Sequence, residues 1–321
     1  MQKMRVGVVR GGPSSEYDVS LRTGENVLHA LSGDRFIPID ILLSKEGEWF
    51  MNGVQTDLGN IATHVDVIWN ALHGTFCEDG KVQRMFEQFS IPYTGSDSLS
   101  SAIGMHKGLS KDRFRQANML VPDGDVIEEG DNLHEAALSI YHNRPLPVIV
   151  KPISGGSSVA TRIVSNPTDL LYAITAASKY GDVLIEDVIL CVEATVCVID
   201  GKVPGSHYAL FPIEIVPPAK HEFFDFDAKY SGESKEICPG RFTLGVHSTL
   251  RDLAISAHKS IGARHYSRTD FIISPKGIYA LEINTLPGLT AESLVPKALK
   301  AAGMSFPGFL EHVIDLSLTR R

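Results

Sequence analysis

The stretch SRTDFIISPKGIYALEIN, residues 267–284, decides the fold of this chain. Apolar and β-branched residues fill 267–274 and 278–284, and Pro-Lys-Gly separates the two runs, so the pattern predicts a β-hairpin. Asp270 and Glu282 lie equally far from Lys276 in the middle of this turn. Folding about Lys276 therefore sets the two carboxylates opposite each other.

Three oxygen-bearing side chains converge on this hairpin, with Arg268 two residues before the first of them. Side chains alternate along a strand, so Glu282 and Asn284 share the face that meets Asp270. Like charges opposite each other in a sheet repel, so a positive group should lie between them, and hard oxygen donors suit Mg²⁺. The alternative is a surface hairpin with solvated acids. The apolar flanks argue against it, because buried carboxylates need a partner or a metal.

Composition sets the broad class. The 321 residues are 43% hydrophobic and 21% charged, which is ordinary for a soluble globular protein with two or three domains. The net charge of −8 argues against a nucleic-acid partner. No apolar run approaches the roughly 18 residues that a membrane span needs, and the start lacks the pattern of a signal peptide. Four cysteines without metal-ligand spacing suggest reduced thiols, so we expect a cytoplasmic protein.

Strand and helix signals alternate through the first hundred residues. This order predicts the α/β class, with an N-terminal domain built on a doubly wound parallel sheet. The strands are expected at 6–9, 37–43 and 65–69, the helices at 21–31 and 81–89. A helix at 98–117 then leads into a second unit, with strands at 146–151 and 159–164 and a helix from Pro167. The expected domains are 1–98, 99–186 and 187–321.

A Gly/Ser loop follows the strand that ends at Lys151. In Lys151-Pro-Ile-Ser-Gly-Gly-Ser-Ser, glycines let backbone N–H groups approach an anion, and Ser157 and Ser158 add hydroxyl donors. Lys151 supplies a point charge for phosphate. The order of residues is not that of a Walker A loop. Such a loop alone is more often a flexible connection, but beside an acidic hairpin it favours a phosphate lid.

Two further sites are predicted near the first sheet. Ser14 or Ser15 could cap the helix that follows the first strand, where Glu16 lies in the first turn. An acid at that position often only complements the helix dipole. His73 follows the third strand, where open α/β sheets bind ligands, although a lone histidine is slightly more often structural.

The middle of the chain contains two weaker signals. Glu186 ends an apolar strand, whose edge could bind a base, and Glu193 could hold ribose hydroxyls; exposed hairpin acids are an equal alternative. The segment 223–230 looks like a mobile loop with Lys229 and Tyr230 near its tip. It could also be a core strand followed by a solvated turn.

Together these motifs resemble the D-alanine–D-alanine ligase family of the ATP-grasp superfamily over nearly the whole chain. The matching segments, in order, are Gly11-Gly-x-Ser-x-Glu-x-x-Val-Ser-Leu, His73-Gly-Thr-x-x-Glu-Asp-Gly, Lys107, Lys151-Pro-x-x-x-Gly-Ser-Ser, Glu186 with Glu193, Asp227-Ala-Lys-Tyr, Arg268-x-Asp-Phe, Glu282-Ile-Asn-Thr-x-Pro-Gly-x-Thr and Ser293-Leu-Val-Pro. No single segment is decisive, but the ordered set is very specific. The resemblance implies an ATP-grasp architecture, in which two α+β subdomains after the N-terminal domain clamp ATP.

The resemblance also assigns roles. ATP would phosphorylate one D-alanine, and the amine of a second would attack the acyl phosphate. Two Mg²⁺ ions, or Mn²⁺ in their place, would be held by Asp270, Glu282 and Asn284. ATP would contact Lys107, Lys151, Ser157, Ser158, Glu186, Asp187, Ile189, Glu193, Phe223 and Lys229. The amino acids would contact Glu16, Val19, His73, Arg268, Gly288, Ser293 and Leu294. The catalytic group would be Glu16, Ser157, Tyr230, Arg268 and Gly288, of which Arg268 and the Gly288 N–H form the oxyanion site.

The chain departs from the family pattern at three positions. Gly155 replaces a frequent acid, Ala160 replaces a glycine, and Asp187 replaces a lysine or an apolar residue, which would alter the lid and the electrostatics around adenine. Tyr230 favours an amino acid as the second substrate, although D-serine or D-lactate remains the alternative. A nucleotide-binding regulator without turnover is a third hypothesis, against which the intact metal set and Arg268 argue. The family implies a homodimer.

Overall fold

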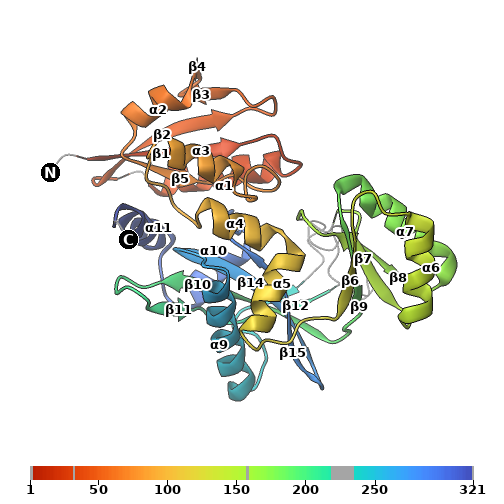
Figure 1. Cartoon of the computed structure of the whole chain (residues 1–321). Helices are drawn as coiled ribbons and strands as arrows, with labels where there is room; N and C mark the ends of the chain where they lie inside the picture. Colours follow the sequence, from red (N-terminus) through yellow and green to blue (C-terminus); the bar gives the residue numbers. More distant parts are fainter. Residues whose placement is uncertain (1–2, 32, 157–158, 218–234, 320–321) are drawn as a thin grey trace.

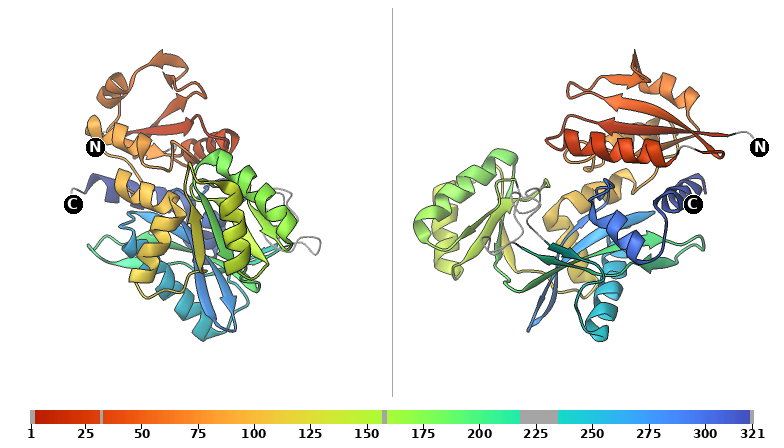
Figure 2. Two further views of the ribbon diagram at one scale, coloured as in Figure 1. Left: turned by 45° about the vertical axis from the view of Figure 1, so that its right-hand side comes forward. Right: turned by 180° about the vertical axis from the view of Figure 1, so that it is seen from behind.

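The computed structural model describes residues 3–31, 33–156, 159–217 and 235–319 and has three separate β-sheets (Figure 1). The first sheet is formed by strands within residues 4–70, the second by strands within the yellow-green lobe of residues 124–187, and the third by strands within residues 192–284, which run from green to blue. Figure 2 shows the three sheets from two other sides. None of the helices in the described part of the chain combines the length and apolar character that a membrane span requires.

The N-terminal sheet has the order β4-β3-β2-β1-β5. Its strands are β1 (Met4–Gly11), β2 (Phe36–Leu43), β3 (Trp49–Met51), β4 (Val54–Thr56) and β5 (Val67–Asn70), and its helices are α1 (Tyr17–Ala30), α2 (Leu58–His64) and α3 (Lys81–Gln88). β1 pairs with β2 and β5 in parallel, whereas β3 and β4 form an antiparallel edge. Val6 and Val8 pack on the side of α1, and Val9 packs on the side of α2 and α3. The predicted doubly wound sheet is confirmed.

The segment predicted as one helix over 98–117 is two helices. α4 (Ser98–Met105) and α5 (Lys107–Gln116) are separated at His106, whose ψ of 101° is not helical. The His106 side chain accepts a hydrogen bond from Leu109 N and so caps α5. The single-helix prediction was wrong because this local capping interaction breaks a run that contains no proline.

The second sheet has four antiparallel strands in the order β6-β9-β7-β8. They are β6 (Gly124–Ile127), β7 (Val148–Pro152), β8 (Arg162–Val164) and β9 (Val183–Asp187). α6 (Leu133–Asn143) and α7 (Pro167–Ala177) share a core with the sheet, and the short 3₁₀ helix η1 (Ser178–Tyr180) follows α7. The predicted start of α7 at Pro167 is confirmed, and Asn166 caps it through Asp169 N.

The third sheet has the order β13-β12-β10-β14-β15, with β11 paired to β10. Its strands are β10 (Val192–Asp200), β11 (His207–Ala209), β12 (Ile213–Val216), β13 (Lys235–Ile237), β14 (Tyr266–Ser274) and β15 (Gly277–Asn284); its helices are α9 (Leu244–Ser260), α10 (Leu294–Ala301) and α11 (Phe306–Leu318). α5 and α9 cover one face. The other face shares a core with the N-terminal sheet, around Trp69, Tyr266 and Phe309. This shared core joins the first and third sheets.

The predicted hairpin is β14 and β15, and Asp270 pairs with Glu282. The turn is tighter than predicted, because Ser274 pairs with Gly277. A bulge at Leu281 restores the register, since Phe271 pairs with Ala280 while Asp270 pairs with Glu282. The predicted pairing of the two carboxylates is therefore confirmed, but the bulge produces it. The predicted domain boundaries remain a prediction; α4 and α5 pack on β15 of the third sheet.

Candidate active site

Two cavities meet between the three sheets. The larger has a volume of about 690 Å³ and lies between the second and third sheets; the smaller, of about 540 Å³, lies between the first and the third. Glu16, Glu193, Asp270 and Glu282 line both. Every described residue of the predicted site lines one cavity or the other. Ser157, Ser158, Phe223, Lys229 and Tyr230, together with the segment around them that was predicted to close the site, lie outside the described residues.

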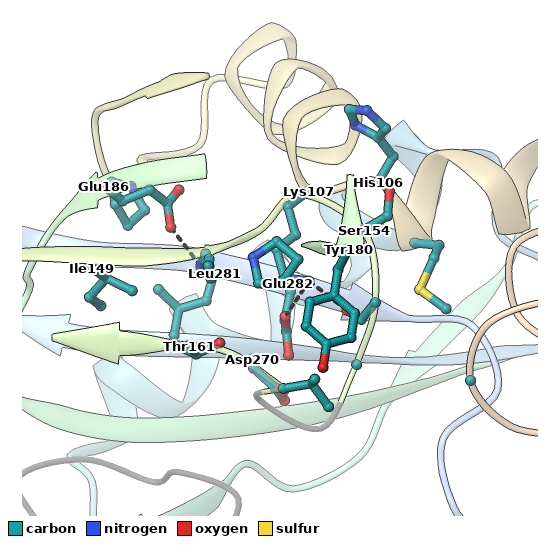
Figure 3. A pocket seen from close by; sticks show the side chains of 18 of the residues that line it. His106, Lys107, Ile149, Ser154, Thr161, Tyr180, Glu186, Asp270, Leu281 and Glu282 are labelled. Atoms are coloured by element: carbon teal, nitrogen blue, oxygen red, sulfur yellow. Dashed lines mark hydrogen bonds and ion pairs between the residues drawn. The ribbon is translucent and has the colours of Figure 1, made fainter. Parts of the chain in front are cut away.

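Asp270 and Glu282, the acidic residues of the hairpin, line the larger cavity (Figure 3) and also the smaller one, so they stand at the junction of the two. Arg268 binds Asp270 through two hydrogen bonds of 3.0 and 2.9 Å, and Thr195 Oγ1 donates to Asp270 Oδ1 at 2.5 Å. Lys107 Nζ lies 3.9 Å from Glu282 Oε2. Positive groups therefore neutralise both acids, as the repulsion between facing carboxylates requires.

The donor set at this junction suits a hard divalent cation. Asp270, Glu282 and Asn284 offer carboxylate and amide oxygens, which Mg²⁺ prefers. Asn284 Oδ1 accepts from Leu286 N at 2.9 Å, which fixes the amide with its oxygen toward the start of the following loop. An amide oxygen has a second lone pair, so this hydrogen bond leaves one for an ion.

Arg268 is held in a partly buried position beside the carboxylate of Asp270. Burial alone would lower the pKa of Arg268, but the charge and hydrogen bonds of Asp270 raise it above its ordinary value. The guanidinium therefore stays charged at any physiological pH, and it lines the smaller cavity near Gly288. A fixed positive group there can stabilise developing negative charge on a substrate oxygen.

Buried charges gather at the opposite end of the larger cavity. Glu186, at the end of β9, is 1% exposed, and its Oε2 lies 2.6 Å from Lys151 Nζ on β7. Its Oε1 contacts the ammonium of Lys111 on α5, which is also 1% exposed. Burial would raise the pKa of Glu186, but the two lysines lower it. Sequence reasoning missed Lys111; its place four residues after Lys107, on the same helical face, was the available signal.

The next residue, Asp187, is engaged by Arg144. The Arg144 guanidinium contacts Asp187 Oδ1 at 2.6 Å and Asp125 Oδ2 at 2.5 Å, and reaches Asp123 at 3.3 Å. Burial would lower the pKa of Arg144, but the aspartates raise it. Arg144 was also missed, because nothing in its sequence neighbourhood marks a partner so far along the chain. Its position explains how an aspartate is accommodated beside the cavity.

The described part of the Gly/Ser loop is anchored to α5. Lys107 Nζ donates to Gly155 O at 2.6 Å. Gly155 has φ +116°, which glycine adopts without strain and an acidic residue would not. Ala160 has φ 52°, a left-handed conformation that suits the glycine common at this position better. The two departures from the family pattern thus have opposite effects on backbone strain.

The smaller cavity contains a buried histidine–glutamate pair. His73 Nδ1 lies 3.4 Å from Glu78 Oε1, and His73 Nε2 lies 2.9 Å from Thr23 Oγ1. Burial would lower the pKa of His73, but Glu78 raises it; burial also raises the pKa of Glu78. Glu16 offers a carboxylate oxygen within 4.8 Å of both. The cluster gives this end of the cavity an anionic character that suits an ammonium group.

Helix α1 is not capped as predicted. Glu16 is the N-cap residue itself, and no side-chain hydrogen bond caps the helix. Ser14 Oγ instead donates to His73 O at 2.6 Å and accepts from Glu16 N. The capping prediction was wrong because Ser14 ties α1 to the loop after β5. That contact holds Glu16 near His73.

The far wall of the smaller cavity is the start of α10. Ser293 is its N-cap residue, and the Ser293 hydroxyl accepts from Thr290 N at 3.1 Å. A Cβ on Gly288 would stand 3.0 Å from that hydroxyl, so the Gly288 backbone lies close to it. Lys297, one turn further, binds Glu236 Oε2 at 2.6 Å and lines the same cavity. Sequence reasoning missed this pair.

A nucleotide-sized cavity clamped between two antiparallel sheets, with lysines at one end and paired acids at the other, defines an ATP-grasp enzyme. The comparisons with known proteins agree with this class. The family description "D-ala D-ala ligase C-terminus" matches residues 114–315, and "D-ala D-ala ligase N-terminus" matches 5–61 and 52–96. The chain belongs to the D-alanine–D-alanine ligase family.

Individual relatives match along their whole length. The chain is 37% identical over 321 residues to a D-alanine–D-alanine ligase from Syntrophobacter fumaroxidans, covering 99% of this chain and 98% of that protein. The crystal structure of VanG D-Ala:D-Ser ligase from Enterococcus faecalis has a TM-score of 0.87 at 28% identity, covering 99% and 100%. D-alanine–D-alanine ligase from Bacillus anthracis complexed with ATP has a TM-score of 0.81 at 31% identity, covering 98% and 97%.

Proposed function

We propose that this enzyme joins two D-alanines into D-alanyl-D-alanine at the expense of ATP, as a step in peptidoglycan precursor synthesis. The observation that carries the proposal is the junction of the two cavities at Asp270 and Glu282. One cavity has the size and charges for a nucleotide, the other those for small zwitterions. Phosphate transfer between them needs the acids to stand where the cavities meet.

The reaction proceeds in two steps. A carboxylate oxygen of the first D-alanine attacks the γ-phosphorus of ATP, ADP leaves, and an acyl phosphate forms in the smaller cavity. The second D-alanine, its amino group deprotonated, then attacks the carbonyl carbon through its nitrogen, and phosphate leaves as the carbonyl is restored and the nitrogen loses its extra proton to the departing phosphate or to water. Arg268, charged and held by Asp270, stabilises the oxyanion of the tetrahedral intermediate together with the Gly288 N–H.

The remaining residues bind and orient. Glu16, beside His73, receives the ammonium of the first substrate. Lys107 and Lys151 contact the phosphates, and the segment 186–193 contacts the nucleoside. Asp270, Glu282 and Asn284 would hold Mg²⁺, which neutralises the transferring phosphoryl group when bound. Ser293 and Leu294, at the start of α10, face the carboxylate of the second substrate.

Phosphate release from ATP and Mg²⁺ tests this proposal. The enzyme is assayed with D-alanine alone, and then with D-alanine paired with D-serine, D-lactate or L-alanine, and the product is identified by mass and chirality. We expect release stoichiometric with D-alanyl-D-alanine. Release only with D-serine, the second substrate in the name of the E. faecalis relative, would mean that the second amino acid is D-serine and not D-alanine. ATP binding without release in any mixture would favour a regulator.

We also propose a cellular location, a domain organisation and an oligomeric state for the enzyme. Cys77, Cys191, Cys197 and Cys238 are all free thiols, in keeping with a reducing cytoplasm. We also propose the domains 1–98, 99–186 and 187–321 and a homodimer, on the family resemblance. Light scattering coupled to gel filtration tests the dimer: a mass near 35.0 kDa would contradict it, since that is the mass of one chain.

A further inference from the structure

Lys111 bridges the two walls of the larger cavity. It belongs to α5, which packs on β15 and α9 of the third sheet. Its ammonium contacts Glu186 on β9, which belongs to the second sheet. Figure 1 shows α5 beside the third sheet and β9 in the separate lobe. A buried ion pair therefore connects the two halves of the clamp at the base of the cavity.

The shape of the second sheet leaves room for this contact. Gly124 on β6 stands opposite Glu186, and a Cβ on Gly124 would come within 2.6 Å of Ile185 O and 3.0 Å of Glu186 Cγ. Any larger residue would push the carboxylate out of position. Glu186 is thus enclosed by β6, Lys151 and Lys111, with its side chain 2% exposed. Its two oxygens are divided between the two ammonium groups.

This division sets the charge that the cavity presents. With Lys151 alone, the carboxylate would form a neutral pair and compete with phosphate for the ammonium. With a second ammonium, the cluster has a net charge of one positive unit, and Lys151, which lines the cavity, retains attraction for an anion. Lys111 does not line the cavity, so it acts through Glu186.

We propose that Lys111 is a positioning residue for the nucleotide: from its place beside the third sheet it fixes Glu186, and through it Lys151, in the second sheet, and it gives the cluster its net positive charge. The proposal rests on the ATP-binding part of the proposed function and is independent of which amino acids are joined. The alternative is that Lys111 only stabilises the fold.

The charge of the cluster should also depend on pH. Burial and the nearby charge of Lys151 lower the pKa of Lys111 to about 7, against the attraction of Glu186. The charged groups that act on it are Glu186 from β9, Lys151 from β7 and Glu282 from β15. As pH rises through this value, Lys111 loses its proton and the cluster becomes neutral. Binding of the anionic nucleotide should weaken over that range.

Three variants test the proposal. Lys111→Met removes the charge, Lys111→Arg keeps it, and Lys259→Met removes an exposed charge on α9 as a matched control. The dissociation constant of ATP with Mg²⁺ is measured by calorimetry at about pH 6 and about pH 8.5, on either side of the titration. Thermal unfolding of each variant is recorded alongside. Comparing variant with wild type at each pH cancels the titration of ATP itself.

We expect Lys111→Met to weaken ATP binding about tenfold at the lower pH, equivalent to about 1.4 kcal/mol, and much less at the higher pH. Lys111→Arg should restore affinity and remove the pH dependence, since arginine stays charged. A lower unfolding temperature with unchanged ATP affinity at both pH values would overturn the proposal. If Lys111→Met does not fold, the pH profile of Lys111→Arg decides: a profile like that of the wild type would overturn it.

Failure of the proposed function would look different. Wild-type enzyme that binds ATP in the expected pH-dependent way, but forms no dipeptide, would contradict the ligase assignment and leave the role of Lys111 intact.

Discussion

Replacing Asp200 with asparagine should lower the free energy of unfolding of this protein and leave both cavities unchanged. Asp200 ends β10, and its side chain is fully buried. Oδ1 accepts hydrogen bonds from His207 Nδ1 at 2.8 Å and His258 Nε2 at 3.1 Å, and Oδ2 accepts from His265 N at 2.7 Å. Burial would raise the pKa of Asp200, but His258 and the other donors lower it, so the group is ionised at neutral pH.

The size of the effect follows from the donors that converge on this carboxylate. Asparagine offers one oxygen and one NH₂ group, so it can satisfy the donors on one side only and faces the others with a donor of its own. Losing one or two charge-assisted hydrogen bonds costs about 3 kcal/mol. A change of that size lowers the unfolding midpoint of a 321-residue chain by roughly 4–5 °C, because the entropy of unfolding grows with chain length.

The effect should also have a definite pH dependence. Because folding lowers the pKa of Asp200, its contribution is fully present above the unfolded value of about 3.9 and is lost as pH falls through the folded value. The difference between wild type and Asp200→Asn should therefore be present at neutral pH and shrink below about pH 4.

Urea unfolding followed by circular dichroism measures the difference, with Asp252→Asn on the exposed face of α9 as the matched control. The control should unfold like the wild type. A difference below about 1 kcal/mol at neutral pH would refute the reasoning, because it would mean that the histidines find other partners at little cost.

Three further changes act on the cavities. Glu282→Gln should lower phosphate release at least about a hundredfold, with a higher Mg²⁺ requirement and an unchanged fold by circular dichroism; near-normal turnover would contradict the metal assignment. Arg268→Lys loses the two-pronged contact with Asp270, so kcat should fall by about 10²–10³; a change in the KM for ATP alone would argue against an oxyanion role. Gly124→Ala should destabilise the protein by about 1–3 kcal/mol and weaken ATP binding, since the new methyl group meets Ile185 O; wild-type behaviour in both assays would disprove the close approach.

Predictions from the sequence succeeded where a feature depends on a local pattern of residues. Two apolar and β-branched runs on either side of Pro-Lys-Gly identified β14 and β15, and the symmetry of Asp270 and Glu282 about Lys276 gave their pairing. That symmetry gives the right pair only for a regular ladder, however. The structure reaches the same pair by a two-residue turn and an extra residue at Leu281, two departures that cancel.

The residues that were missed take their meaning from distant partners. Lys111 and Glu186 are 75 positions apart, and Arg144 and Asp187 are 43 apart, so no short stretch of sequence contains both members of either pair. The helix break at His106 depends on a side chain that turns back on the backbone. A propensity argument averages over such a residue, since its capping hydrogen bond forms only in the folded chain.

The bulge at Leu281 also decides where this gene can gain or lose codons. Insertions at the turn between Ser274 and Gly277 lengthen an exposed tip and leave the strand faces unchanged. A one-codon deletion between the tip and Glu282 would remove the bulge and leave a regular ladder in which Asp270 still pairs with Glu282. A one-codon insertion there would add a second extra residue, and a slip of one residue turns a strand over, so the acid would face the core packed by α9. Insertions among relatives should therefore cluster at the tip of this hairpin and avoid its shaft.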